Sequence, residues 1–325
     1  MTTTPTHDQH GSAPTPGRVR DAVLDRVEDR LARLFADEGR SRRTSDPRSA
    51  VLVAGVAELV QAGAERAHPV ICLTGYLAAG GDPAADDVVS ASVALELLDT
   101  CLMIRDDVRT NASLRRGIPT LHISHAAEHE RNGWSGESRR FGEGTAVLAG
   151  DLALAYGDRF AARLPYAAWE LWDGLRTERA VGAHAEAAAA TEYLDDAWPG
   201  QCLDDCGSGC GAGWYGLRHA LLIGAALAGR EDLRETYEAY ARAVHGAWRI
   251  RGFLRGGPGF DGDAQFLRDI FFDARARADA EETIAGLLDR ADSAVAVAPL
   301  SPGWRTELRA FARRVAGCEP GHDTP

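Results

Sequence analysis

The chain has 325 residues, of which 45% are apolar and 26% charged, and its formal charge is −12 at pH 7. This composition is typical of a globular protein with one large core or two small ones. The acidic balance argues against a nucleic-acid partner, because no basic face is available to neutralise phosphates in bulk. No run of about 18 apolar residues occurs, so we expect no membrane span.

The two ends of the chain differ in composition from the rest. Residues 1–17 are rich in Thr, Pro, His and Gly and lack the apolar segment of a signal peptide, and residues 317–325 look similar. We interpret both as disordered tails. Helical periodicity continues between them without a linker-like stretch, so residues 18–316 are predicted to form one domain.

Hydrophobic periodicity predicts helix almost throughout this domain, and strand-like alternation is nearly absent. In the first segment, apolar residues recur at steps of three and four from Val19 to Leu34. The simplest architecture is an all-α bundle of about ten or more helices around a central cavity. The expected helices cover residues 19–36, 50–62, 69–79, 86–110, 142–164, 166–193, 215–228, 231–254, 266–291 and 302–316.

Cysteine and lysine usage limits the chemistry that is available. Cys202, Cys206 and Cys210 recur every four residues, which on a helix would align three thiols. The spacing is not that of a zinc knuckle, so close packing of small residues is favoured over a metal or redox site. Free cysteines indicate a reducing compartment, the cytoplasm.

The chain has no lysine and 36 arginines. Schiff-base chemistry is therefore excluded, and a phosphate clamp must use Arg, backbone N–H groups or a metal.

One segment, residues 94–122, carries a dense set of charged residues and reads ALELLDTCLMIRDDVRTNASLRRGIPTLH. Asp106 and Asp107 end an otherwise apolar helix, and acids that face a cavity need a cation. Mg²⁺ prefers carboxylate oxygens together with water and substrate phosphate. Arg115 and Arg116 follow shortly after and can clamp the same phosphates. The segment predicts half of a Mg²⁺–diphosphate site, with a solvated helix end of mixed charge as the alternative.

These residues resemble the first aspartate-rich region of the polyprenyl synthetase family, the trans-prenyl diphosphate synthases. That region typically reads E-L-L-H-x-x-x-L-x-H-D-D-x-x-D-x-x-x-x-R-R-G-x-P-x-x-H. Further segments match in order: Gly150-Asp151 resembles the family's L-G-D-x-L, residues 200–204 its G-Q-x-x-D, and residues 223–229 its L-G-A-x-x-A-G. The resemblance covers roughly residues 51–254.

The resemblance implies the isoprenoid-synthase fold, an allylic prenyl diphosphate as substrate and Mg²⁺ ions between two acidic helices. It also implies a dimer, either of this chain or with a homologue. Gln201 would be a substrate contact. Cys101 and Leu102, one helix turn below Asp106, would gauge the length of the prenyl tail, and Cys101, being small, would leave room for a longer one.

The chain departs from the family at the pocket for isopentenyl diphosphate. The family's G-K-R-x-R-P reads AERAHP at residues 64–69, so that Lys becomes Glu65, the second Arg becomes His68, and Arg66 remains as a candidate substrate contact. The pocket's His becomes Asp99. A carboxylate at Glu65 would repel a second diphosphate by about 3 kcal/mol at ~5 Å and an effective dielectric of about 20. Ordinary chain elongation is therefore not expected.

The second aspartate-rich motif is also missing. The family's F-Q-x-x-D-D-x-x-D aligns with WRIRGFLRG at residues 248–256, which contains no acid but adds Arg251 and Arg255. These arginines would either hold the diphosphate directly or neutralise Asp106 and Asp107 in an inactive site. The family's Lys-Thr pair is Ala212-Gly213 here.

Two further acidic features have open interpretations. Asp99 shares a helix face with Asp106 but lies about 10 Å lower, too far for the same ion. It would act as a base or carbocation stabiliser, or pair with a nearby Arg. Asp269 and Asp273, at i and i+4, are either a displaced second metal site or a solvated acidic pair.

The sequence therefore predicts a Mg²⁺-dependent enzyme of isoprenoid biosynthesis that binds and ionises an allylic prenyl diphosphate. It would be a terpene synthase or a prenyltransferase to a non-standard acceptor, with Asp106, Asp107 and Asp99 as catalytic residues. One alternative is a non-catalytic subunit or prenyl-diphosphate-binding partner of an active synthase, which the loss of the second motif favours. The other is an elongating E-polyprenyl diphosphate synthase.

Overall fold

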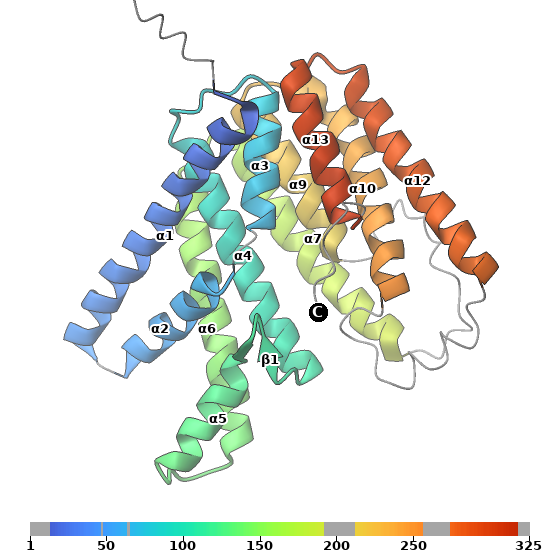
Figure 1. The fold of residues 1–325 in the computed structure, drawn as a ribbon. Helices are drawn as coiled ribbons and strands as arrows, with labels where there is room; N and C mark the ends of the chain where they lie inside the picture. The colour runs from blue at the N-terminus through green and yellow to red at the C-terminus, as the bar shows by residue number, and fades with distance from the viewer. Residues whose placement is uncertain (1–13, 47, 64–65, 192–211, 256–273, 318–325) are drawn as a thin grey trace, which may run out of the picture.

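A computed structural model describes residues 14–46, 48–63, 66–191, 212–255 and 274–317 (Figure 1). Within these residues the protein is a bundle of α-helices, which confirms the predicted all-α class. A two-stranded antiparallel hairpin joins β1 (Leu114–Arg115) to β2 (Ile118–Pro119). The helices are α1 (Pro16–Ser45), α2 (Ser49–Gln61), α3 (Ala67–Ala78), α4 (Asp87–Thr110), α5 (Leu121–Arg131), α6 (Ser138–Ala161), α7 (Tyr166–Thr191), α9 (Ala212–Leu227), α10 (Arg234–Arg255), α12 (Ala274–Ala296) and α13 (Pro302–Val315), with a 3-10 turn η1 (Glu231–Leu233).

Helix α4 lies in the middle of the bundle and divides the core in two (Figure 1). One side of α4, including Leu95 and Leu98, packs in a cluster with α7, α9 and α10. The other side, including Leu97 and Ile104, packs in a cluster with α1, α2 and α6. Because burying each leucine stabilises the fold by about 2 kcal/mol, both faces of α4 are fixed by packing, and its last turn is held in a defined orientation.

The end of α4 is set by local backbone chemistry. Asn111 caps the helix with a φ of 51°, in the left-handed region that Asn tolerates better than most residues. In the hairpin that follows, Arg116 and Gly117 are the two turn residues, with φ values of 53° and 77°. Positive φ at both turn residues is the signature of a type I′ turn, whose twist matches that of the flanking strands. Arg115 precedes this turn, and it is the reversal at Asn111, where the Ala112 amide donates to the carbonyl oxygen of Asp107 at 3.0 Å, that brings it back towards the end of α4.

The close approach of α5 to α6 depends on a glycine. A Cβ at Gly142 would lie 2.2 Å from the carbonyl oxygen of His122 and 2.9 Å from the amide nitrogen of Ala126, both backbone atoms of α5. A side chain at this position would push the two helices apart. Along the same helix, Gly150 faces Cys101 of α4. Small residues on α6 thus let it contact α5 and α4 closely.

Most of the predicted helices occur within a few residues of their expected bounds, but α5 was not predicted. The side chains that α5 buries against its neighbours include His122, His125 and His129, in addition to Leu121. Because these histidines are polar residues, a search for apolar periodicity misses the helix. The hairpin was also missed, since strands of two residues are too short to show alternation. None of the helices in the described ranges has the length and apolar character needed to cross a membrane.

Candidate functional site

Asp106 and Asp107 lie in the last turn of α4 and have very different surroundings. The side chain of Asp106 is 43% exposed, whereas that of Asp107 is 3% exposed. Adjacent helix residues point about 100° apart, so one carboxylate faces solvent and the other faces protein. The two acids are therefore not an equivalent pair, which the sequence alone did not reveal.

Arg115 joins the two carboxylates from the hairpin. Its Nε donates to Asp107 Oδ1 at 2.7 Å, and its Nη2 lies 3.4 Å from Asp106 Oδ2. Arg109, in the same last turn of α4, donates to Asp106 Oδ1 at 2.5 Å. The structure thus places Arg115 beside both acids, where the sequence analysis expected it.

Burial dominates the electrostatics of Asp107. Burial raises its pKa, the hydrogen bond and charge of Arg115 oppose that shift, and the charge of Asp106 adds to it, leaving the pKa above its ordinary value. The neighbouring imidazole of His122 has its pKa lowered by burial. Both ring nitrogens of His122 are buried without a hydrogen-bond partner among the described residues. Sequence reasoning used His122 only as part of a motif and assigned it no role.

The residues at the end of α4 fit a Mg²⁺ ion that shares its coordination with a substrate. Asp106 offers exposed carboxylate oxygens, and Asp107 lies next to it. In the part of the chain that the structure describes, no cluster of three or more His, Cys, Asp or Glu side chains forms a metal cage. Mg²⁺ usually keeps several waters and binds through one or two carboxylates plus phosphate oxygens. The donor set therefore suits a metal that arrives with a diphosphate.

Arg116 does not lie beside these acids, so in this structure the two arginines of the expected clamp face different parts of the protein. Its Nη1 donates to the carbonyl oxygen of Leu59 at 3.0 Å, and its guanidinium fills the space over Gly63. Its Nη2 lies 4.0 Å from Asp99 Oδ2. The reason is the tight turn, which sends consecutive side chains of the hairpin in different directions.

Asp99 contacts a histidine. His68 Nδ1 lies 3.4 Å from Asp99 Oδ1, and the two side chains are 23% and 24% exposed. Burial lowers the pKa of His68, the charge of Asp99 opposes this, and the charge of Arg179 adds to it. Within the described ranges, the expected pairing of Asp99 with an Arg takes the form of the longer contact to Arg116. These are the two positions at which the sequence departs from the family's Arg and His.

Arg66 is a structural residue rather than a substrate contact. Its side chain is only 4% exposed. Its Nη1 donates to Glu96 Oε1 and to the carbonyl oxygen of Val60, both at 2.7 Å, and its Nε and Nη2 donate to the carboxylate of Glu28. Its donors are thus engaged by residues of α1, α2 and α4 in this structure.

Arg251 likewise does not face Asp106 and Asp107. Its guanidinium binds both carboxylate oxygens of Glu281 on α12, and its Nε donates to the carbonyl oxygen of Ala316 at 2.8 Å. Neither expected role, holding a diphosphate or neutralising the first acidic pair, matches this placement. The side chain of Arg255 is outside the described residues. At Gly252, which aligns with the first Asp of the missing motif, a Cβ would meet no atom within 4 Å.

Cys101 is buried and packs towards α6. The Cβ position of Gly150 lies 3.8 Å from its sulfur, and burial raises the pKa of the thiol to about 11. The neighbouring Leu102 packs against the opposite core cluster. Leu102 is four residues before Asp106 and lies on its face of α4, so it, rather than Cys101, is placed to contact a tail that extends below Asp106.

Several predicted features lie outside the described residues. They are Glu65, Gln201, Cys202, Cys206, Cys210, Asp269 and Asp273.

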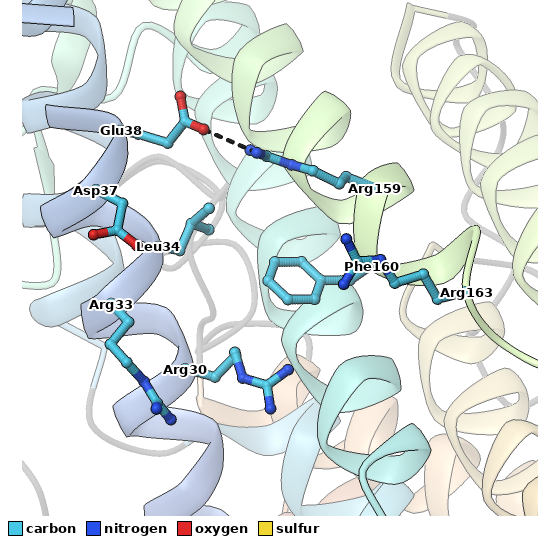
Figure 2. A pocket seen from close by; sticks show the side chains of 8 residues that line it. All are labelled: Arg30, Arg33, Leu34, Asp37, Glu38, Arg159, Phe160 and Arg163. Atoms are coloured by element: carbon cyan, nitrogen blue, oxygen red, sulfur yellow. Dashed lines mark hydrogen bonds and ion pairs between the residues drawn. The ribbon is translucent and has the colours of Figure 1, made fainter. Parts of the chain in front are cut away.

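A charged cavity that sequence reasoning did not anticipate lies far from this site. It has a volume of about 390 Å³ and lies between α1 and the C-terminal end of α6 (Figure 2). Arg159 reaches across it to Glu38 at 2.9 Å, and Arg30 pairs with Asp86, next to the start of α4. The cavity therefore lies at the opposite end of α4 from Asp106. Its arginines were visible in the sequence but showed no motif.

Comparisons with known proteins agree on one family. Residues 50–195 match the family model described as polyprenyl synthetase. A short chain isoprenyl diphosphate synthase of Methanothermobacter thermautotrophicus is 31% identical over 121 residues, covering 37% of this chain and 32% of the relative. The large subunit 1 of the chloroplastic heterodimeric geranylgeranyl pyrophosphate synthase of Arabidopsis thaliana is 32% identical over 164 residues, covering 50% and 38%. The match thus spans about a third of the length of these curated relatives.

Solved structures extend the likeness in fold to nearly the whole chain. The geranylgeranyl pyrophosphate synthase from Corynebacterium glutamicum, complexed with isoprenyl diphosphate and magnesium, has a TM-score of 0.76 at 21% identity. The alignment covers 92% of this chain and 99% of that chain. A geranyltranstransferase from Thermotoga maritima has a TM-score of 0.65 at 16% identity, with 92% and 99% covered. At these identities the likeness shows the fold.

Proposed function

We propose that this protein, whose residues 50–195 match the polyprenyl synthetase family model, is an enzyme of isoprenoid metabolism that binds and ionises an allylic prenyl diphosphate. The observation that carries the proposal is the arrangement of Asp106, Asp107 and Arg115 at the end of α4. It combines carboxylates for a metal with a guanidinium for phosphate oxygens.

In the proposed reaction, Asp106 and Asp107 would hold Mg²⁺, which when bound supplies positive charge to the leaving diphosphate. Arg115 would contact the same diphosphate from the hairpin, since its guanidinium already spans both acids. Leu102, one turn below, would contact the proximal part of the prenyl chain.

The residues at the positions of the family's isopentenyl diphosphate pocket support a reaction without isopentenyl diphosphate. At two positions where the family has an Arg and a His, this chain has His68 and Asp99, which pair with each other. Arg66, retained from the family's motif, is occupied by Glu28 and Glu96. A carboxylate at Asp99 would repel a second diphosphate. We therefore propose that the cation cyclises, loses a proton or meets an acceptor without a diphosphate.

The named relatives favour one alternative, an elongating synthase, because their printed names are those of isoprenyl diphosphate synthases. A second alternative is a non-catalytic partner of such a synthase, which the absence of acids at residues 248–256 favours. The dimer would then be a heterodimer, as in the name of the Arabidopsis relative.

Incubation of the purified full chain with allylic diphosphates separates these functions. Geranyl, farnesyl and geranylgeranyl diphosphate are supplied with Mg²⁺, with and without isopentenyl diphosphate, and pyrophosphate release and organic products are measured. The proposal predicts pyrophosphate and a hydrocarbon or alcohol without isopentenyl diphosphate. Longer prenyl diphosphates formed only in its presence would identify an elongating synthase. Turnover only after an active synthase is added would identify the non-catalytic partner.

A further inference from the structure

We infer that the cavity between α1 and the C-terminal end of α6 is a second ligand site, which binds a phosphate-bearing small molecule whose apolar group lies on Leu34 and Phe160. The site is separate from the proposed function. Arg30 on its wall pairs with Asp86, the residue that precedes α4. Asp106 follows Asp86 by 20 residues, about 30 Å along the helix, so the two sites hold different molecules.

Four arginines line the cavity from two sides. Arg30 and Arg33 reach it from α1, whereas Arg159 and Arg163 reach it from the last turn of α6 and the residues that follow (Figure 2). Four guanidinium groups around one cavity repel one another and favour an anion between them. The volume of about 390 Å³ lies in the range of pockets that hold small molecules. The cavity therefore suits a small anion.

The two carboxylates that also line the cavity do not cancel this charge. Asp37 forms an ion pair with Arg40, which lies outside the lining. Glu38 accepts from Arg159 at 2.9 Å and has a second guanidinium, that of Arg42, at 3.5 Å. Both acids are thus partnered in part by arginines from outside the cavity, and the lining itself holds four arginines against two carboxylates.

Two of the lining arginines are held in place by the protein. Arg159 pairs with Glu38, and its guanidinium carbon lies 4.8 Å from the centre of the Tyr156 ring. Arg30 donates from both Nη atoms to the carboxylate of Asp86, at 2.6 and 3.4 Å. Side chains that are already ordered lose little conformational entropy when a ligand binds. These two arginines therefore provide a fixed positive wall.

The other two arginines have free donors. Arg163 makes no hydrogen bond or ion pair with any residue that the structure describes. Arg33 donates from Nε to the carbonyl oxygen of Asp29 at 3.1 Å, which leaves its Nη groups free. The hydrogen bond and charge of Arg30 lower the pKa of Asp86 most, and the charge of Arg163 adds to that effect. Free guanidinium groups bind phosphate oxygens in a bidentate manner.

The apolar side chains of the lining point to the rest of the ligand. Leu34 is 9% exposed, and Phe160 packs against both core clusters, so both are fixed by the core. An inorganic phosphate ion would leave their surface in contact with water. A phosphate that carries an alkyl group would cover it and gain the hydrophobic contribution. We therefore expect an alkyl phosphate to bind more tightly than inorganic phosphate.

The test titrates the full chain with hexyl phosphate and with inorganic phosphate, by calorimetry at low salt and with a chelator that removes Mg²⁺. Without metal, the carboxylate of Asp106 repels phosphate. Arg33→Gln and Arg163→Gln each remove one free guanidinium. Arg290→Gln is the matched control, because Arg290 on α12 is also exposed and without an ion pair among the described residues. Arg115→Gln reports on binding near Asp106, and thermal unfolding shows whether each variant folds.

We expect one hexyl phosphate per chain, bound at least about tenfold more tightly than inorganic phosphate. Its affinity should fall at least about tenfold in Arg33→Gln and in Arg163→Gln, as for the loss of a charged hydrogen bond. It should stay within about twofold of wild type in Arg290→Gln and Arg115→Gln. Added salt should weaken binding, because it screens the arginines.

Unchanged affinity in Arg33→Gln or Arg163→Gln would overturn the site, as would an equal fall in Arg290→Gln. An equal fall in Arg115→Gln would place the ligand near Asp106 and also overturn it. Equal affinity for the two phosphates would overturn the role of the apolar side chains.

A further arm separates a free phosphate ester from a lipid headgroup. The chain is sedimented with vesicles of phosphatidylcholine and phosphatidic acid, and we expect it to stay in the supernatant. Binding to these vesicles without binding of hexyl phosphate would assign the arginines to a membrane surface and overturn the cavity as the site. All of these measurements are made without turnover, so their failure leaves the proposed function standing.

Discussion

Arg115 Nε donates to Asp107 Oδ1 at 2.7 Å, so a carboxylate buried at the end of α4 is neutralised by a residue of the following hairpin. The left-handed backbone of Asn111 makes this contact possible, because it reverses the chain after α4 before Arg115 is reached. Arg116, the first residue of the type I′ turn, instead reaches α2. The two adjacent arginines of the hairpin thus have different partners: Arg115 contacts Asp107, and Arg116 contacts the carbonyl oxygen of Leu59.

These two arginines are predicted to differ in their effects on activity. Arg115→Gln leaves Asp107 without its cation and removes a phosphate contact, so kcat/KM for the allylic diphosphate should fall roughly 100-fold, the equivalent of about 2–3 kcal/mol for a charged hydrogen bond. Arg116→Gln should lower kcat/KM by less than about tenfold. Steady-state pyrophosphate release measures both. An equal fall in kcat/KM in the two variants would contradict the prediction that Arg115 and Arg116 have different roles.

The contact of Arg251 with Glu281 and Ala316 predicts a role in stability. Arg251→Ala removes an ion pair and a hydrogen bond that tie α10 to α12 and to the end of α13, so the free energy of unfolding should fall by about 1 kcal/mol. Activity should stay within about threefold. Chemical denaturation and pyrophosphate release are measured on the same preparation. A large loss of activity at unchanged stability would place this arginine at the diphosphate after all.

The packing of α5 on α6 predicts opposite results for two glycines two residues apart. At Gly142 an added Cβ would meet backbone atoms of α5, whereas at Gly144 it would meet no atom within 4 Å. Gly142→Ala should therefore lower the free energy of unfolding by about 3 kcal/mol. Gly144→Ala should raise it by about 0.5–1 kcal/mol, because alanine favours helix. Similar values for the two variants would show that this helix contact is misplaced.

Glu38 predicts a component of the pH dependence of stability. Burial alone would raise its pKa, but hydrogen bonds from Arg159 and Tyr156 and the charge of Arg42 outweigh that effect and leave the pKa below its ordinary value of 4.5. A lowered pKa in the folded state contributes stability that is present above the ordinary value and is lost as the pH falls through the folded value.

The matching experiment compares urea denaturation of wild type and Glu38→Gln between about pH 6 and pH 3. The difference in the free energy of unfolding between them should shrink as the pH falls below about 4.5. A constant difference would contradict the lowered pKa.

Sequence patterns predicted the helices whose buried faces are apolar, and they failed where the buried face is polar. Helix α4 was bounded almost to the residue because its apolar run ends at charged residues and Asn111. Helix α5 was missed because His122, His125 and His129 form much of its buried face. Its packing depends on Gly142, and no pattern in one sequence shows which glycine meets another backbone.

The candidate site was predicted in its residue types but not in its pairings. Spacing brought Arg115 to Asp106 and Asp107, because a short hairpin leaves few alternatives. It could not separate Arg115 from Arg116, since that depends on the φ angles of a turn. Nor could it pair His68 with Asp99 or Arg251 with Glu281, because those contacts join helices whose relative positions follow only from packing.

The central claim is that Asp106 and Asp107 hold the metal for ionising an allylic diphosphate. Its most direct test is Mg²⁺-dependent pyrophosphate release from farnesyl diphosphate without isopentenyl diphosphate, in wild type, Asp107→Asn and Asp292→Asn. Asp292 is a matched control, because it pairs with Arg309 and Arg313 away from the site. We predict release by wild type and Asp292→Asn and a loss of at least roughly 100-fold in Asp107→Asn. Undiminished release by Asp107→Asn would contradict the account.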